Sequence, residues 1–597
     1  MRKWVNRWLA FGLSLLVSLS VCDFGRADET KTGNDSKPAA VKPAGSKPEA
    51  ALTDRERWLL ERVEQLEKRV ADLESKEAKP PVEATAAPAP SVSNEMTAEA
   101  KPATSAAPGT MTNAAAGAVP ISMSTSIAAA IGPKNESSTS TNATQVPEKK
   151  KIEPFSDADW TWLNGNPRTK EIFWDSKFFT PEIRADINYV QDFNHPVDHS
   201  IGGSSELFRS SEVQLEQLGA GGDFHYDNVR GRLMTQFGMY SVTTPRNDPS
   251  PGHGQWDLTG AYRYLSEAYG GYHFNVLHGI NVDAGIFMSY VGLFSYYNFD
   301  NWAYQPSYVS SNTPWFFQGV RVQIFPTAHL KIEPWFINGW QSYGSANHKP
   351  GLGGQIKWTP KPWLNIISNN YGLGEDDLFI HGRSRIHTDN SIEVKYYDKP
   401  EKTLDKMAFS LTGDLGCEYG SGVSCYGNHK GGPKQSFVGW MGYNRFWFHR
   451  DLFGVTIGGG QINNPGRYLV LIPPINGESA VTAATSSPYF SGNPGDPFKA
   501  WDSSITFDYM PKQYITFRAE YDYRHASVPY WTGQGGITPP NGNTGSPQFF
   551  VCSNGASSGQ TSLGAAETSC GGGLNSVWFP DLRKNESFID LSILVKF

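Results

Sequence analysis

The sequence has only one long hydrophobic run, residues 9–21, and it follows Arg2, Lys3 and Arg7 at the N-terminus. After residue 27, no stretch reaches the roughly 18 to 20 apolar residues that a membrane-spanning helix requires. We therefore predict no membrane-spanning helix in the rest of the chain.

Short catalytic motifs are also missing. The sequence has no GxSxG nucleophile elbow, no HExxH pair and no phosphate-binding GxxxxGK[ST] loop. His195 and His199 are four residues apart, but Pro196 opposes the helix that would place both on one metal. We predict no enzyme, no metal site and no cofactor.

Strong net charge is absent as well. A formal net charge of -7 over 597 residues favours neither a nucleic-acid partner nor a pore of one sign. What is present is 13% aromatic residues, 60 glycines and a modest 39% hydrophobic content. This composition is typical of a β-barrel whose strands are half apolar and whose membrane interfaces carry aromatic residues.

The N-terminal run resembles a secretory signal peptide, since small residues at Gly25 and Ala27 occupy the two positions that a signal peptidase reads. We expect cleavage after Ala27, followed by a disordered segment, residues 28–51. Cys22 raises a lipoprotein alternative, but bulky Val21 stands where lipoproteins have a small residue.

Residues 587–597 have the length and alternation of one transmembrane β-strand. The final aromatic residue resembles the signal read by the barrel-assembly machinery of Gram-negative bacteria. We therefore predict a barrel in the lipid of the outer membrane, with that machinery as a partner. The apolar face comprises Ile589, Leu591, Ile593, Val595 and Phe597, alternating with Asp590, Ser592, Leu594 and Lys596.

Residues 155–597 read as sixteen antiparallel strands with a period of two residues. The predicted strands begin near Glu182, Arg209, Asn228, Tyr262, Gly279, Trp315, His329, Gly351, Trp363, Ser384, Leu404, Gln435, Leu452, Ala500, Gln513 and Ser587.

The predicted connections alternate between tight and long, and every tight one follows an even-numbered strand. Bacterial barrels show the same alternation of short periplasmic turns and longer outside loops. An even number of strands also leaves both ends of the barrel in the periplasm. The long segments include residues 242–255, 290–314, 463–499 and 526–585.

Cysteine is scarce, and beyond Cys22 it occurs as two local pairs, Cys417 with Cys425 and Cys552 with Cys570. Both pairs fall in predicted outside loops, in a compartment that permits disulfides. The CxxC spacing of zinc sites is absent. We predict two disulfides that close these loops.

Residues 52–75 carry a heptad seam that predicts a coiled coil. A lone amphipathic helix is the alternative, because Glu56 falls at one a position and Leu60 at an e position. Residues 76–154 are rich in Ala, Pro and Ser, which predicts a disordered linker. The seam consists of Leu52, Leu59, Val63, Leu66, Val70 and Leu73.

Three segments, 159–165 (DWTWLNG), 319–327 (GVRVQIFPT) and 336–340 (FINGW), together with Phe597, resemble the OmpL-like family of outer-membrane β-barrel porins. The resemblance implies an all-β barrel that lets small hydrophilic solutes diffuse passively. It also implies a trimer, whereas Val at a and Leu at d of the coiled coil favour a dimer. A plugged barrel that displays its loops as an adhesin, anchored through its coiled coil, is the alternative.

The polar residues that alternate with apolar ones along such strands face the lumen, so we expect a lining with charges of both signs. Pairing of these charges across strands is the structural alternative. The predicted pore-lining residues are Arg184, Arg230, Arg232, Glu212, Glu216, Lys331, Glu333, Lys357, Glu393, Lys395, Arg518, Glu520, Asp522 and Arg524.

The third long loop, residues 290–314, is rich in aromatic residues, including Tyr296, Tyr297, Trp302 and Tyr304. In sixteen-stranded porins such a loop commonly folds inward as a constriction, where aromatic faces could stack on sugar rings. A membrane girdle or an oligomer contact is the alternative for these side chains.

Overall fold

The computed structural model describes residues 153–250, 254–345, 349–375, 382–427, 432–465, 489, 497–542, 549–573 and 575–597. All of them belong to one compact unit, residues 114–597. The predicted signal peptide (1–27), the disordered segment (28–51), the coiled coil (52–75) and the linker as far as residue 152 lie outside the described residues.

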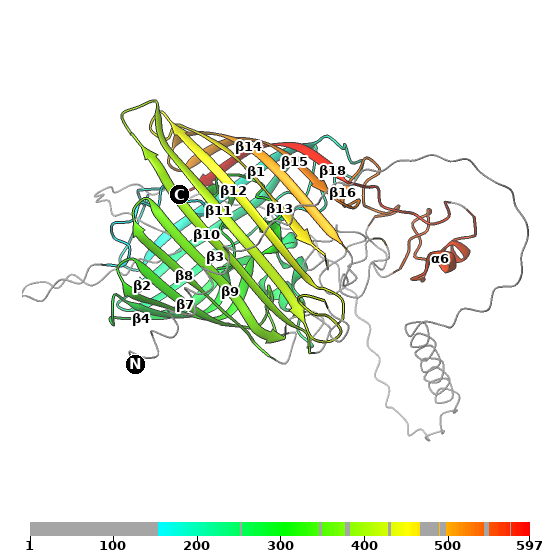
Figure 1. Cartoon of the computed structure of the whole chain (residues 1–597), viewed down its shortest axis with the longest axis horizontal. Coiled ribbons are helices and arrows are strands. Elements are labelled where there is room, and N and C mark those ends of the chain that lie inside the picture. The colour runs from blue at the N-terminus through cyan, green and yellow to red at the C-terminus, as the bar shows by residue number, and fades with distance from the viewer. Residues whose placement is uncertain are drawn as a thin grey trace, which may run out of the picture. The chain divides into compact units, whose positions relative to one another are not determined.

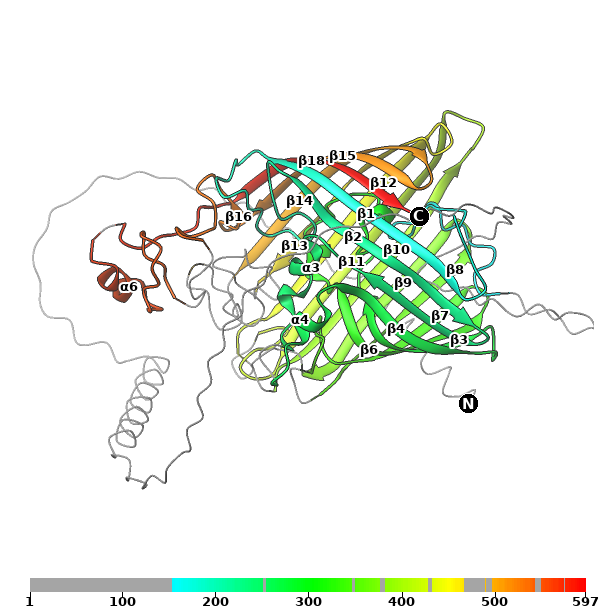
Figure 2. The same cartoon turned by 180° about the vertical axis from the view of Figure 1, so that it is seen from behind.

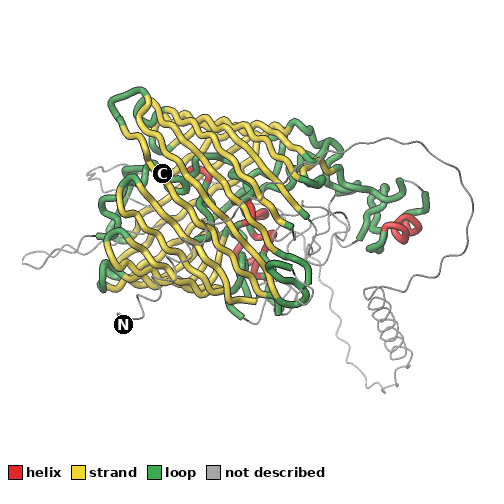
Figure 3. Tube along the Cα trace, in the orientation of Figure 1, coloured by secondary structure: helices red, strands yellow, loops and turns green. Residues whose placement is uncertain are grey.

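Sixteen antiparallel strands within the described residues close into one barrel, drawn in yellow in Figure 3. Neighbours in sequence are neighbours in the barrel, and β1 pairs with β18 to close it (Figure 2). This confirms the predicted fold class. The strands, most of them labelled in Figure 1, are β1 (Phe179–Asp192), β2 (Val213–Tyr226), β3 (Val229–Thr235), β4 (Leu265–Phe274), β5 (Ile280–Met288), β6 (Phe316–Thr327), β7 (Leu330–Ile337), β8 (Gly351–Lys361), β9 (Leu364–Glu375), β10 (Ser384–Asp398), β11 (Leu404–Tyr419), β12 (Ser436–Phe448), β13 (Phe453–Asn464), β14 (Phe498–Lys512), β15 (Ile515–Ala526) and β18 (Asn585–Lys596).

Tight turns join β2 to β3, β4 to β5 and so on to β14 and β15, so all of them lie at one end of the barrel, here called the turn end. The long connections lie at the opposite, loop end. Asp227 in the β2–β3 turn has a left-handed backbone (φ 58°), a conformation that Asp tolerates better than most residues. Each predicted strand start lies within four residues of an observed one.

The two faces of the strands differ in polarity. On β18, Ile589, Leu591 and Ile593 are exposed on the outside, whereas Asp590 and Ser592 are buried on the inside. A closed barrel in lipid needs this arrangement, because its outer face meets hydrocarbon.

Large aromatic side chains gather on the outer face toward both ends of the strands. Trp358 and Trp363 are exposed near the turn end, and Trp440 and Trp501 are exposed toward the loop end. Aromatic rings at these levels match the two interfaces of a membrane.

Short elements lie in the connections. These are α3 (Tyr240–Thr243), η2 (Pro245–Asn247), α4 (Leu258–Tyr262), η4 (Asn298–Asp300), η5 (Ser310–Asn312), α6 (Leu563–Ser569) and a two-stranded sheet of β16 (Trp531–Thr532) and β17 (Leu582–Arg583). None of the helices in the described part of the chain has the length and hydrophobicity to cross a membrane.

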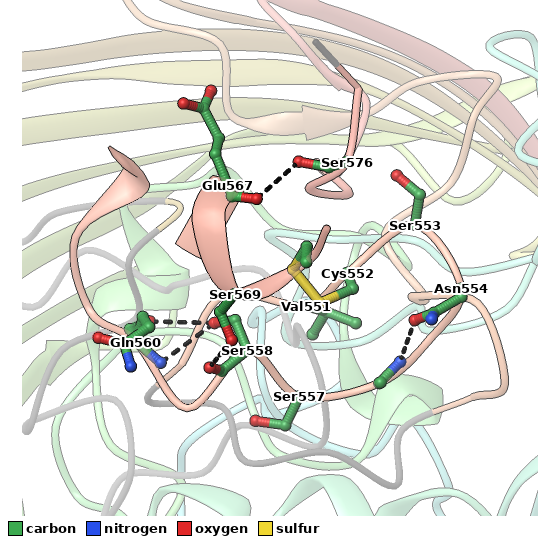
Figure 4. The surroundings of a disulfide bond; sticks show 12 residues. Val551, Cys552, Ser553, Asn554, Ser557, Ser558, Gln560, Glu567, Ser569 and Ser576 are labelled. Atoms are coloured by element: carbon green, nitrogen blue, oxygen red, sulfur yellow. Dashed lines mark hydrogen bonds between the residues drawn. A yellow bond between two sulfur atoms is a disulfide. The ribbon is translucent and has the colours of Figure 1, made fainter. Parts of the chain in front are cut away.

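Two disulfides join the predicted cysteine pairs. Cys417 at the end of β11 is bonded to Cys425 in the following loop, with their Cα atoms 5.1 Å apart. Cys552 is bonded to Cys570, which follows α6, across 18 residues of the last long connection (Figure 4). There the Ser569 hydroxyl donates to the Ser558 carbonyl at 2.8 Å, so the disulfide is one of several contacts within this loop.

We expect the double variant Cys552→Ser/Cys570→Ser to keep a folded barrel but to lose order in the loop that carries α6. The bond closes a loop without touching a strand, so its loss raises only the entropy of that loop. Limited proteolysis should cut the variant within residues 549–573, while heat-modifiable migration on gels stays as in the wild type. Loss of the folded, fast-migrating form would contradict this assignment.

Candidate functional site

The interior face of the barrel carries the polar side chains of the alternating strands. In β1, Ile183 is 48% exposed on the outside, whereas Arg184 and Asp186 are each 5% exposed. Because the barrel is closed, this buried alternating face is its interior. The predicted pore-lining residues whose side chains lie on it are Arg184, Arg230, Arg232, Glu216, Lys331, Glu333, Lys357, Glu393, Lys395, Arg518, Glu520, Asp522 and Arg524. That they line a path for solutes remains a prediction.

Glu212 lies elsewhere. We predicted a strand from Arg209, but β2 begins at Val213, so Glu212 belongs to the preceding loop. It forms an ion pair there with Arg209, and its side chain is partly exposed. Ser211 has a left-handed backbone (φ 62°), which interrupts the extended conformation that an earlier strand start would need.

Ion pairs connect neighbouring strands across the interior. Arg232 on β3 contacts Glu182 on β1 at 3.2 Å and Asp223 on β2 at 2.9 Å. It also contacts Glu267 on β4 at 2.9 Å. One guanidinium therefore links four consecutive strands of the wall, which is the cross-strand pairing that we considered as the alternative to a pore lining.

A second centre lies on β12, β14 and β15. Asp508 on β14 contacts Arg518 on β15 and Arg445 on β12, each at 2.7 Å. All three side chains are almost fully buried. Because Asp508 is shared by two arginines in an interior of low dielectric constant, these three side chains hold the wall rigid.

Two interior carboxylates differ from these pairs. Among the described residues, the carboxyl groups of Glu216 and Asp590 form no ion pair. Their hydrogen-bonding neighbours are Asn188 and Ser592 respectively, and both side chains are fully buried. Asp590 also lies opposite Glu520 in the β15–β18 register. Because a carboxyl group outside an ion pair is costly to remove from water, this part of the interior favours water and ions.

The loop between β5 and β6, residues 289–315 and here called the inward loop, folds into the barrel. The backbone N–H groups of Tyr304 and Gln305 both donate to the Glu520 carboxylate on β15 at 2.6 Å. The backbone N–H of Tyr308 donates to Asp502 on β14 at 2.8 Å. Interior carboxylates thus bind the backbone of this loop.

The inward loop also reaches other parts of the wall. The Tyr290 hydroxyl donates to the Asn370 carbonyl on β9 at 2.8 Å, near the start of the loop. Further along, Asp300 pairs with Arg184 on β1 at 3.1 Å. The loop therefore spans the interior from β9 to β1 and β15.

The four aromatic residues singled out in this loop are buried and face the wall. The Tyr297 hydroxyl donates to Glu267 at 2.9 Å, and the Tyr304 hydroxyl donates to Asp186 at 2.8 Å. Tyr296 donates in the same way to Gln236 on the wall, and Trp302 packs edge-on against Trp447. These residues hold the loop in place inside the barrel, and they form neither an outer girdle nor an oligomer contact.

The sequence profile of the family described as "Putative beta-barrel porin-2, OmpL-like" matches residues 184–564, more than half of the chain. The chain belongs to this family. It is an outer-membrane porin, and the family's function is that of a passive channel.

Several solved structures resemble this porin at low identity. OmpT of Vibrio cholerae has a TM-score of 0.37 and 10% identity, with 71% of this chain and 99% of that chain covered. The outer membrane channel DcaP of Acinetobacter baumannii has a TM-score of 0.36 and 12% identity, covering 71% and 99%. OprB of Pseudomonas putida has a TM-score of 0.38 and 10% identity, covering 70% and 94%. No curated protein matches the chain.

A second connection of the porin, residues 193–212 between β1 and β2, contacts the inward loop. Its Glu206 accepts a hydrogen bond from the Tyr240 hydroxyl on α3, and that hydroxyl accepts one from the Asn298 side chain at 3.0 Å. Burial raises the pKa of Glu206 to about 7, although the hydrogen bond from Tyr240 acts in the opposite direction.

The protonation of Glu206 makes stability depend on pH. The unfolded chain releases this proton near pH 4.5, whereas the folded porin keeps it up to about pH 7. Stability should therefore fall as the pH rises between these values and stay lower above them. We expect Glu206→Gln to make this fall smaller than in the wild type, measured as the midpoint of thermal unfolding in detergent between pH 4.5 and about 8. Glu212→Gln, in the same loop, is the control, and a wild-type slope in the Glu206→Gln variant would overturn the assignment.

Proposed function

We propose that this porin allows small hydrophilic solutes to diffuse passively across the outer membrane, through an interior lined by charges of both signs. The observation that carries the proposal is the interior face, which holds ion-paired arginines such as Arg232 and also carboxyl groups that form no ion pair among the described residues, Glu216 and Asp590. A lining of this kind suits hydrated solutes and does not enforce one sign of ion. No catalytic step or cofactor is part of the proposal.

The proposed orientation places the turn end in the periplasm and the loop end outside the cell. Bacterial barrels commonly have short periplasmic turns. The strand β1 begins and β18 ends at the turn end, so the predicted linker and coiled coil would lie on the periplasmic side. The two disulfides at the loop end suit an oxidising compartment.

Assembly is proposed to involve other copies of the chain and the barrel-assembly machinery. The resemblance to porins favours a trimer, and the heptad pattern of residues 52–75 allows a dimer. The outward apolar face of β18 is the candidate segment for recognition during insertion.

A second candidate function is a plugged barrel that displays its long loops at the cell surface. The buried position of the inward loop supports it, since residues from Tyr296 to Asn312 are all buried inside the barrel. Conductance separates this candidate from an open porin.

We expect stepwise single-channel openings from the purified protein, residues 28–597, in a planar bilayer. A variant that lacks residues 28–151 should open in the same way, because the polar interior belongs to the barrel alone. Silence from folded protein of both kinds would reject the open porin and leave the plugged barrel.

The inward loop should control the steadiness of the current. Asp502 accepts hydrogen bonds from the Ser307 hydroxyl at 2.9 Å and from the Tyr308 backbone at 2.8 Å. We expect Asp502→Ala to free this part of the loop and to increase the open-channel noise. Asp502→Asn should behave more nearly like the wild type, because its amide keeps one acceptor oxygen.

The control is Ser503→Ala on the outer face of the same strand. If Asp502→Ala and Ser503→Ala have the same noise as the wild type, Asp502 does not hold the loop.

A further inference from the structure

Residues 155–168, here called the cross-strap, precede β1 and run along the turn end of the barrel. At one end, the Phe155 backbone N–H donates to the Ala328 carbonyl in the β6–β7 turn at 2.6 Å. The Phe155 ring also packs edge-on against Phe325 on β6, with ring centres 6.2 Å apart. The start of the cross-strap is thus fixed to the β6–β7 hairpin.

The other end of the cross-strap is fixed to the β14–β15 turn. The Arg168 guanidinium donates to the carbonyls of Gln513 at 2.8 Å and Ile515 at 2.6 Å. It also donates to the Thr516 hydroxyl at 2.9 Å. Arginine can make several directed hydrogen bonds of this kind at once, because its donors form a planar fork.

These two anchor points lie on opposite sides of the barrel. Six strands, β8 to β13, separate the hairpins in one direction around the wall. Six strands, β18 and β1 to β5, separate them in the other direction. A segment that is bound at both hairpins therefore connects opposite sides of the turn end.

Between its ends the cross-strap is bound to the side of the barrel formed by β8 to β10. The Trp162 indole N–H donates to the Pro362 carbonyl in the β8–β9 turn at 3.0 Å. Asp159 accepts a hydrogen bond from Lys395 on β10 at 2.8 Å. The Asn164 backbone N–H donates to Glu393, also on β10, at 2.9 Å.

The contacts change the role of three residues that we predicted to line the pore. Glu393 and Lys395 bind the cross-strap, and the Lys357 ammonium lies 4.4 Å from the centre of the Trp160 ring. Their charges therefore hold a segment of the chain against the wall.

The cross-strap also packs against the inward loop. The Asn164 side-chain oxygen accepts a hydrogen bond from the Trp302 backbone at 2.8 Å. Gly165 has a left-handed backbone (φ 69°), and a Cβ atom there would lie 2.4 Å from the Leu293 carbonyl oxygen. Trp162 belongs to the same buried apolar cluster as Leu293 and Trp302. The two segments form one packed layer, and Gly165 is required for their close approach.

We infer that the cross-strap is a second constriction element, which narrows the turn end on the side of β8 to β10 and thereby sets the size limit of the pore. The inference rests on the proposed passive diffusion. It adds a specificity-determining segment that packs directly against the inward loop at the turn end.

The test uses two variants of the full mature protein. Arg168→Met removes the anchor at the β14–β15 turn, and Gly165→Val pushes the cross-strap away from the inward loop. Gly413→Val on β11 is the matched control, since a Cβ atom there meets nothing within 4 Å. Heat-modifiable migration on gels establishes that each barrel is folded.

Two measurements are made on each variant. Single-channel conductance should rise about twofold when the covered half of the opening is freed, because current follows the cross-section of the pore. The largest sugar that permits liposome swelling should also increase. The second measurement is maleimide labelling of Asn365→Cys, a buried position whose amide binds Glu393 behind the cross-strap. Labelling should become faster in both variants.

The outcomes separate the inference from the proposed function. A conducting wild type with unchanged conductance, size limit and labelling in the variants overturns the inference and leaves the porin function intact. No current from any protein, with faster labelling in the variants, rejects passive diffusion but supports a cross-strap that covers the opening. No current and no change in labelling rejects both.

Discussion

Every backbone N–H and C=O group of a strand in lipid needs a partner on a neighbouring strand, and the pairing of β1 with β18 supplies the last row of partners. Closure also separates the two faces of all sixteen strands. The outer face must be apolar, so polar and charged residues have only the interior. The ion pairs, the inward loop and the cross-strap all depend on this separation.

The interior charges have a structural use that is distinct from selectivity. Glu520 and Asp502 bind backbone N–H groups of the inward loop, and Glu393 binds one of the cross-strap. An irregular segment inside a barrel cannot satisfy its own backbone groups by pairing with strands, so acceptors on the wall take that role. Mixed charge thus both lines the interior and holds the segments that narrow it.

The strands could be predicted well because their signal is local. Alternation and turn residues placed most strand starts within a few residues, and the cysteine pairs were close in sequence. Glu212 was placed on a strand because alternation alone does not reveal the left-handed backbone at Ser211. The motif at residues 159–165 was recognised as part of a family resemblance, but nothing in its composition indicated which turns it would contact.

The sequence by itself determined which residues face lipid and which face the interior, because a period of two residues fixes the face of every side chain once a strand forms. The tertiary structure decided which interior residues meet one another. Trp162 meets Pro362 and Arg168 meets Gln513, contacts that span 200 and 345 residues. Such contacts form only once the barrel is closed and distant hairpins surround one opening. No local pattern in the chain predicts which of these hairpins a given segment will contact.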